Sequence, residues 1–238
     1  MKKITLRVLG LAVAMLVSAS VAQAQFRQSV YLNGELPVGN FAKKVSHTYS
    51  APMGPSRIGK SATVGFGLGY RASYRFDVGM GMVAPFVNAD FFWNFIGDGW
   101  SDEYVQANAK TPNYFNIPVM LGVSYLYDEL WNDITPFAEF SIGADLFIIG
   151  SERSDKFIYN YAYKPTFQQV LAWSVGIGSY FGEHVSVGLH YYGLGKHTVR
   201  VTQKTYDNFS TLMQTAYDNA AVETRNVGMV ALRIGFHL

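Results

Sequence analysis

Hydrophobic and polar residues alternate along this chain with a period of two. Between residues 62 and 76 every second residue is alanine, valine, leucine or an aromatic residue, and the residues between them are threonine, glycine, arginine and serine. Residues 229–238 repeat the pattern, with Val230, Leu232, Ile234 and Phe236 on one face. Successive side chains point to opposite faces in a strand. The pattern therefore predicts a β-strand in each segment.

Six weaker segments with the same alternation complete a set of eight predicted strands. They are residues 26–36, 82–95, 113–127, 134–148, 168–181 and 185–194. The connections at residues 77–81, 128–133 and 182–184 are short, whereas those at 42–61, 97–112, 149–166 and 195–221 are long and polar. Short turns at one end and long loops at the other are typical of outer-membrane barrels. We predict an all-β fold, an eight-stranded antiparallel up-and-down transmembrane β-barrel.

Composition supports a membrane protein that crosses with strands. Aromatic residues make up 16% of the chain and charged residues only 15%, whereas about 25% charged residues is typical of soluble domains. After residue 24 there is no run of eighteen apolar residues, so we expect no membrane-spanning helix. The chain has no cysteine, so packing alone must stabilise an exported fold. The strands of a soluble barrel of the lipocalin type would show the same alternation. The residues on the two faces must therefore distinguish a soluble barrel from a membrane barrel.

The two faces of the predicted strands differ in volume. The polar face is rich in small residues: Gly122, Ser124, Ser141, Gly143, Ser174, Gly176, Gly178, Ser186 and Gly188. The apolar face carries bulky residues such as Phe91, Trp93, Phe140, Trp173 and Tyr191. The lumen of an eight-stranded barrel is only wide enough for side chains to fill it. We therefore predict that the small, polar face lies inside and the bulky face meets lipid.

Charged residues of the predicted strands fall on the inward face. We expect them to be structural lumen charges: Arg27, Glu35, Arg71, Arg75, Asp90, Glu139, Asp145 and Arg233. Both signs are present, so these side chains can pair. Arginine or lysine on the lipid face would cost about 2–4 kcal/mol at the centre of the bilayer.

Residues 1–24 have the form of a signal peptide, and residues 25–238 form the predicted outer-membrane barrel domain. A basic start and a short apolar stretch precede Ala22-Gln23-Ala24, the small-x-small pattern that signal peptidase cleaves. We predict cleavage between Ala24 and Gln25. Without Lys2, Lys3 and Arg7 the mature chain has 16 basic and 17 acidic residues, so its net charge is −1. The apparent basicity therefore does not predict a nucleic-acid partner.

Pro118 lies inside the fourth predicted strand, where a closed barrel has no free edge to accommodate a residue without an N–H. We expect a local β-bulge at this position.

The sequence resembles the small outer-membrane β-barrel proteins common in Bacteroidetes, which are related in architecture to the OmpA/OmpX-type barrels. The resemblance covers the whole mature chain. It is carried by Tyr31-Leu32-Asn33-Gly34 with Pro37-Val38-Gly39-Asn40-Phe41, by Ile117-Pro118-Val119 and by Thr135-Pro136-Phe137. The last strand, residues 228–238, resembles the signal read by the barrel-assembly machinery, with Leu238 where the family often has an aromatic residue. The resemblance implies location in the cell outer membrane.

Two patterns could carry chemistry, and we interpret both as non-catalytic. Residues 54–61 satisfy the phosphate-loop pattern, but a predicted strand follows them instead of the helix that the mechanism needs. His190 and His237 share the predicted inner surface with Ser186 and Glu139. Four strand positions separate His190 from Ser186, roughly 13 Å, which is too far for a hydrogen bond. We interpret the histidines as hydrogen-bonded lumen residues.

No histidine or carboxylate spacing suggests a metal site. We therefore predict no catalytic, cofactor-binding or metal residues, no cofactor and no enzyme activity.

Specific binding would be expected in the long loops, because loops carry variable surfaces on rigid scaffolds. Aromatic residues outside the strand cores are Tyr49, Trp100, Tyr104, Phe157, Tyr159, Tyr161, Tyr163, Tyr206, Phe209 and Tyr217. They either bind an extracellular ligand or pack on each other and at the lipid interface. Residues 198–205 still alternate, which predicts a ribbon that protrudes beyond the membrane and could bind a partner by strand addition.

These observations favour a structural or surface-interaction role for a barrel with a side-chain-filled lumen and long extracellular loops. The alternatives are an outer-membrane enzyme acting on lipid at the loop-side rim, or a narrow pore. The expected partners are outer-membrane lipids and the barrel-assembly machinery, which would read the C-terminal strand, and we expect a monomer.

Overall fold

The computed structural model describes residues 25–43, 61–97, 113–127, 133–150, 152–154, 160–165, 168–206 and 212–238. Its strands are β1 (Gln25–Val38), β2 (Ala62–Asp77), β3 (Gly81–Ile96), β4 (Tyr114–Asn116), β5 (Val119–Tyr127), β6 (Ile134–Ile149), β7 (Glu152–Ser154), β8 (Asn160–Pro165), β9 (Gln168–Phe181), β10 (Val185–Tyr206) and β11 (Leu212–His237). Among these residues no helix has the length and apolar character needed to cross a membrane.

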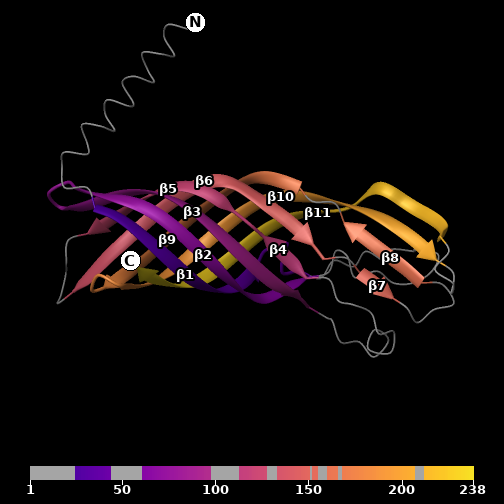
Figure 1. Cartoon of the computed structure of the whole chain (residues 1–238), viewed down its shortest axis with the longest axis horizontal. Helices are drawn as coiled ribbons and strands as arrows, with labels where there is room; N and C mark the ends of the chain where they lie inside the picture. The colour runs from indigo at the N-terminus through magenta and orange to yellow at the C-terminus, as the bar shows by residue number, and fades with distance from the viewer. Residues whose placement is uncertain are drawn as a thin grey trace, which may run out of the picture.

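The strands form a closed antiparallel barrel (Figure 1). Neighbouring strands pair along the chain, and β11 returns to β1 from Ser29 opposite His237 to Val38 opposite Gly228. β4 and β5 together occupy one place in the wall, because both pair with β3 on one side and β6 on the other. The wall therefore has eight strand positions, and the predicted fold class is confirmed.

The prediction for the two faces is also confirmed. On β2, Val64, Phe66, Leu68 and Tyr70 point outward and are 47–57% exposed. The residues between them point into the barrel, where Arg71 is only 4% exposed. Alternation with a period of two thus separates an apolar outer surface from an inner surface that carries the charged side chains.

The prediction of a β-bulge at Pro118 is wrong. Asn116 pairs with Phe92 and Val119 with Ala89, so equal numbers of residues face each other across this point. The same two residues also stay in register with β6. The Pro118 carbonyl accepts a hydrogen bond from the Asp90 N–H at 3.0 Å. A bulge needs an extra residue on one strand; here the ladder only lacks the bond that a proline cannot donate.

Two of the predicted long loops contain strands. β10 and β11 continue past the barrel wall and stay paired as far as Tyr206 and Leu212. β8 adds to the extended part of β10, and β7 adds to β8, which makes a sheet beyond one end of the barrel (Figure 1). The expectation of loops throughout residues 149–166 and 195–221 is therefore wrong. The ribbon predicted from the alternation at residues 198–205 is confirmed.

Glycines on the inward face make room for large side chains from neighbouring strands. Tyr31 on β1 is 2% exposed and lies opposite Gly69 on β2 and Gly235 on β11. A Cβ on Gly235 would lie 2.7 Å from the Cε1 of Tyr31. The interior is therefore not made of small residues alone, because each buried aromatic ring occupies the space that a neighbouring glycine leaves free.

Gly143 on β6 offers a test of this close packing. A Cβ at this position would lie 2.7 Å from the Cα of Met120 and 2.9 Å from the carbonyl carbon of Val119, both on β5. Because backbone atoms cannot move aside as a flexible side chain can, Gly143→Ala should lower the free energy of unfolding by about 1–3 kcal/mol. Urea titration of the refolded barrel measures the change. The matched control is Gly34→Ala, whose Cβ would meet nothing within 4 Å; equal effects of the two substitutions would contradict the packing argument.

Three sequence predictions fall on residues that the structure does not describe. They are the signal peptide with cleavage after Ala24, residues 54–60 of the phosphate-loop match, and the role of the loop aromatics Tyr49, Trp100, Tyr104, Phe157, Tyr159 and Phe209. Ser61, the last residue of that match, leads directly into strand β2.

Candidate functional site

The middle of the barrel interior holds a layer of paired charges. Arg71 and Glu139 form a two-bond pair: Nη1 donates to Oε2 at 2.7 Å and Nη2 donates to Oε1 at 2.6 Å. Arg233 donates from Nη2 to Oδ1 of Asp90 at 2.8 Å and from Nε to Oδ1 of Asn33 at 3.0 Å. These four charged side chains are at most 5% exposed. A two-bond pairing fixes both position and orientation of the guanidinium group.

Aromatic rings support the two central guanidinium groups. The Cζ of Arg71 lies 3.7 Å from the ring centroid of Phe86, and the Cζ of Arg233 lies 4.5 Å from that of Tyr31. Arg233 Nη2 also donates a hydrogen bond to the Tyr192 hydroxyl. Ring faces attract cations most strongly where water is excluded. Guanidinium groups, carboxylates and rings therefore contact one another at this level of the barrel interior.

Towards the long-loop end, an apolar cluster fills the interior. Phe41, just after β1, is fully buried and packs edge-on against Tyr114 at 5.4 Å between ring centroids. Tyr114 stacks on Phe147 at 5.9 Å. The cluster comprises Phe41, Ala62, Phe92, Ile96, Tyr114, Met120, Phe147, Ala172, Tyr192, Leu194, Val227, Met229 and Ala231. This apolar plug and the charged layer are two successive levels of buried side chains in the lumen.

Two further predicted lumen charges are buried near the long-loop end. Asp145 is 0% exposed, and its Oδ2 lies 3.2 Å from the Nε2 of His197. The same Nε2 lies 2.8 Å from the Leu194 carbonyl oxygen. Glu35 is 3% exposed and has no hydrogen-bond partner among the described residues.

The histidines of the interior have different neighbours. The Nδ1 of His190 lies 3.4 Å from Oε1 of Glu139, an ion-pair distance without hydrogen-bond geometry. His237 is fully hydrogen-bonded, with Ser29 Oγ 2.7 Å from Nδ1 and Ser186 Oγ 2.8 Å from Nε2. The interpretation of hydrogen-bonded lumen histidines therefore holds for His237 but not for His190.

This arrangement does not assemble a serine, histidine and acid triad from the four residues considered. The serine Ser186 bonds to His237, whereas the acid Glu139 lies beside His190. The second partner of His237 is Ser29, which cannot stabilise an imidazolium as a carboxylate does. Ser186 is also only 3% exposed. A substrate outside the barrel would not reach its hydroxyl.

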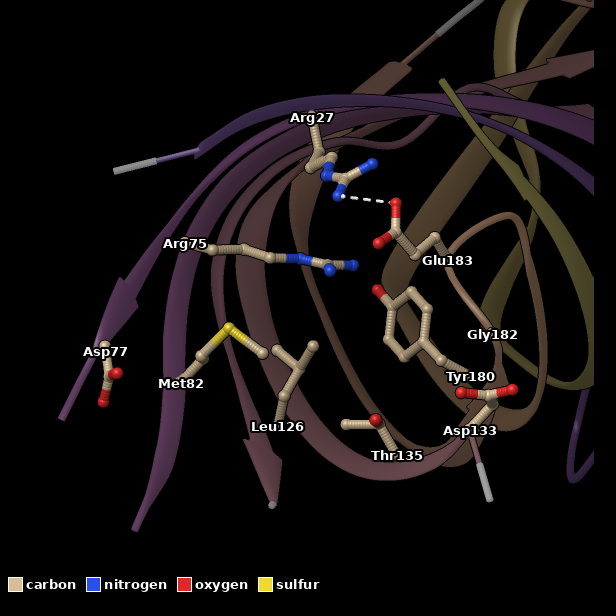
Figure 2. Close-up of a pocket in the computed structure, with 10 residues that line it drawn as sticks. All are labelled: Arg27, Arg75, Asp77, Met82, Leu126, Asp133, Thr135, Tyr180, Gly182 and Glu183. Carbon is tan, nitrogen blue, oxygen red and sulfur yellow. Dashed lines mark hydrogen bonds and ion pairs between the residues drawn. The ribbon is translucent and has the colours of Figure 1, made fainter. Parts of the chain in front are cut away.

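The short-turn end of the barrel opens into a pocket of about 390 Å³ (Figure 2). Arg27 and Arg75, the last two predicted lumen charges, point into it. Arg27 Nη2 lies 3.4 Å from Oε2 of Glu183, and the Cζ of Arg75 lies 4.8 Å from the ring centroid of Tyr180. The pocket is lined by Arg27, Arg75, Asp77, Met82, Leu126, Asp133, Thr135, Tyr180, Gly182 and Glu183. It is a cavity with a largely polar lining at the mouth of the barrel.

Within the part of the chain that the structure describes, no group of three or more histidine, aspartate and glutamate side chains could hold a metal ion. The structure thus places all eight predicted charges on the inner side: four in the central layer, two near the plug and two in the mouth pocket.

Sequence reasoning missed two parts of this interior. It did not find the bonds of His237 to Ser29 and Ser186, which join residues 208 and 51 positions apart. It also did not assign Phe41 to the interior. The segment from Pro37 to Phe41 is part of the family resemblance, but only the fold shows that Phe41 is buried in the lumen.

These features define a class of protein: a closed eight-stranded antiparallel β-barrel with buried charges in its lumen and an apolar outer surface. No protein-family model and no curated protein sequence matches the chain. Solved structures similar to it include a major outer membrane protein from Thermus thermophilus, with 13% identity, a TM-score of 0.46, and coverage of 90% of this chain and 100% of that chain.

Two further similar structures are also outer-membrane or surface proteins by name. Neisserial surface protein A (NspA) has 13% identity and a TM-score of 0.42, over 90% of this chain and 97% of that chain. The outer membrane protein OprG from Pseudomonas aeruginosa has 12% identity and a TM-score of 0.44, over 91% of this chain and 96% of that chain. Identities of 12–13% and TM-scores of 0.42–0.46 support no inference about function, which therefore rests on this chain's own geometry.

Proposed function

We propose that this chain is an integral outer-membrane β-barrel protein with a structural or surface-interaction role. The observation that carries the proposal is the inverted distribution of polarity: the charged side chains of the strands point inward, and the outer surface of the wall is apolar. Leu121, Leu171 and Ile177 are 64–68% exposed on the outer surface of β5 and β9. An apolar surface that continues around a barrel would be unfavourable in water but matches the hydrocarbon core of a bilayer.

A sheet that spans a membrane must also be closed, and this barrel is closed. In hydrocarbon every backbone N–H and C=O must be paired within the protein, and a sheet can achieve this only when it has no edge. The pairing of β11 with β1 removes the edge. The short turns then face the periplasm, and the sheet formed by β7, β8 and the ends of β10 and β11 faces the environment.

The filled lumen supports a structural role over transport. The charged layer and the apolar plug occupy the interior at two successive levels. The separation of Ser186 and His237 from Glu139 gives no support to a lipid-processing enzyme. The same proposal includes a signal peptide at residues 1–24 and a monomeric state. It also includes recognition of the last strand by the assembly machinery and membership of the Bacteroidetes-type family.

Reconstitution tests the membrane assignment. After refolding from urea in the presence of phospholipid vesicles, the chain should float with the lipid. It should also unfold more slowly than the same chain without vesicles. Added protease should leave the strands of the barrel wall intact. A protein that stays folded and monomeric in buffer without lipid or detergent would refute the proposal.

Conductance tests the filled lumen separately. We expect no stable open channels when the refolded protein is added to planar bilayers, because buried side chains block the interior at the charged layer and at the plug. Long-lived conductance steps of uniform size would contradict the filled-lumen part of the proposal while leaving the membrane assignment intact.

A further inference from the structure

We infer that the pocket at the short-turn end binds a zwitterionic amino acid or short peptide, whose carboxylate is held between Arg27 and Arg75. The compartment that supplies this ligand rests on the proposed function, which places the short turns in the periplasm. The chemistry of the pocket follows from its own residues.

The two arginines reach the pocket from neighbouring strands. Arg75 on β2 pairs with Gln25, and Arg27 on β1 pairs with Ser73, so the arginines are diagonal neighbours. Side chains in this relation are within reach of each other when they are long. Figure 2 shows both guanidinium groups directed into the same space. One carboxylate could therefore accept hydrogen bonds from both.

Arg75 is held by a ring and has no described carboxylate within ion-pair distance. Its Cζ lies 4.8 Å from the ring centroid of Tyr180, and Tyr180 in turn packs on the fully hydrogen-bonded His237 at 4.6 Å between ring centroids. The guanidinium is thus positioned over a fixed ring while its N–H groups stay available to a ligand. Such preorganisation lowers the entropy lost on binding.

Glu183 shows where a ligand carboxylate would bind. Its Oε2 lies 3.4 Å from the Nη2 of Arg27, and its side chain is 74% exposed. An exposed pair at this distance contributes little to stability and opens readily. A ligand carboxylate can therefore replace Glu183 on Arg27, and the released Glu183 can then pair with an ammonium group of the same ligand.

The charge balance of the lining favours a zwitterion over phosphate. Among the described residues of the lining, two arginines lie together with the carboxylates of Asp77, Asp133 and Glu183. A phosphate dianion would meet these three negative groups, whereas a ligand that carries one ammonium and one carboxylate complements both signs. Met82 and Leu126 add an apolar wall that suits an uncharged side chain.

Calorimetric titration of the refolded full chain in detergent micelles tests the inference. The probes are the dipeptide Ala-Ala, the same dipeptide blocked at both ends, and inorganic phosphate. We expect saturable binding of Ala-Ala and much weaker binding of the other two. Arg75→Gln should weaken Ala-Ala binding by about tenfold or more, because it removes charge-assisted hydrogen bonds. Lys196→Gln, which removes a cation near the opposite end of the barrel, should leave it unchanged.

Three comparisons of affinity would each overturn the inference. They are binding of the blocked dipeptide as tight as that of Ala-Ala, tighter binding of phosphate, and equal affinities of Arg75→Gln and the unaltered protein for Ala-Ala. If Arg75→Gln does not fold, Arg27→Gln removes the other half of the carboxylate site and should give the same loss. Absence of Ala-Ala binding by a protein that still inserts into vesicles would refute the pocket assignment alone and leave the proposed function standing.

Discussion

Replacement of Arg71 with methionine is expected to lower the free energy of unfolding by about 3–5 kcal/mol. The guanidinium of Arg71 makes two hydrogen bonds with Glu139, at 2.7 and 2.6 Å, and both side chains are almost completely buried. Without Arg71 the Glu139 carboxylate would keep only His190 at 3.4 Å and Arg233 at 3.9 Å as described partners at ion-pair distance. Urea titration of the barrel in vesicles, followed by tryptophan fluorescence, measures the loss.

Two control variants show whether the loss of stability comes from an unpaired buried charge or from lost packing. The double variant Arg71→Met with Glu139→Gln should recover most of the stability, because it removes both charges of the pair. Glu183→Gln breaks an ion pair whose carboxylate is 74% exposed, so it should cost no more than about 1 kcal/mol. If the double variant is as unstable as the single one, uncompensated charge is not the cause.

Replacement of Leu68 with arginine is expected to cost about 2–4 kcal/mol in a bilayer. Leu68 lies in the middle of β2, is 55% exposed and has Leu32 and Phe91 beside it on the neighbouring strands. If this surface meets hydrocarbon, the guanidinium must be inserted where no water solvates it. Unfolding in vesicles of defined thickness gives the difference from the unaltered protein.

Val78→Arg is the matched control. Val78 is 53% exposed, nearly as much as Leu68, but it lies in the turn that follows β2. The proposed orientation places this turn near the interface, where the same substitution should cost about 0–1 kcal/mol. If the barrel were soluble, both arginines would project into water and the two variants would have similar stability. Equal stabilities in vesicles would therefore contradict membrane insertion.

Much of the architecture could be predicted because it depends on neighbouring residues. The alternation from Ala62 to Phe76 fixes the conformation of that segment locally, since only an extended chain separates the two sets of side chains. Volume then distinguishes the faces, because the outward aromatic residues could not all fit inside eight strands. The ribbon of β10 and β11 was also visible as alternation at residues 198–205.

The predictions that failed involve contacts between strands. The bulge expected at Pro118 does not occur, because the neighbours on β3 and β6 keep their register and the ladder does without one hydrogen bond. The loop expected at residues 149–166 contains two short strands, since the extended part of β10 provides an edge on which β8 can pair. Neither outcome depends on local propensity.

The pattern of residues along the chain therefore predicts the eight strands of the barrel wall, their inward and outward faces, and the inward position of the charges. The pairing of those charges, for example Arg71 with Glu139, and the bonds of His237 to its two serines depend on the folded barrel. The burial of Phe41 in the apolar plug and the pocket that Arg27 and Arg75 share at the other end depend on it as well. The physical reason is register: a period of two assigns a side chain to a face, but the pairing of strands far apart in the chain assigns it a neighbour.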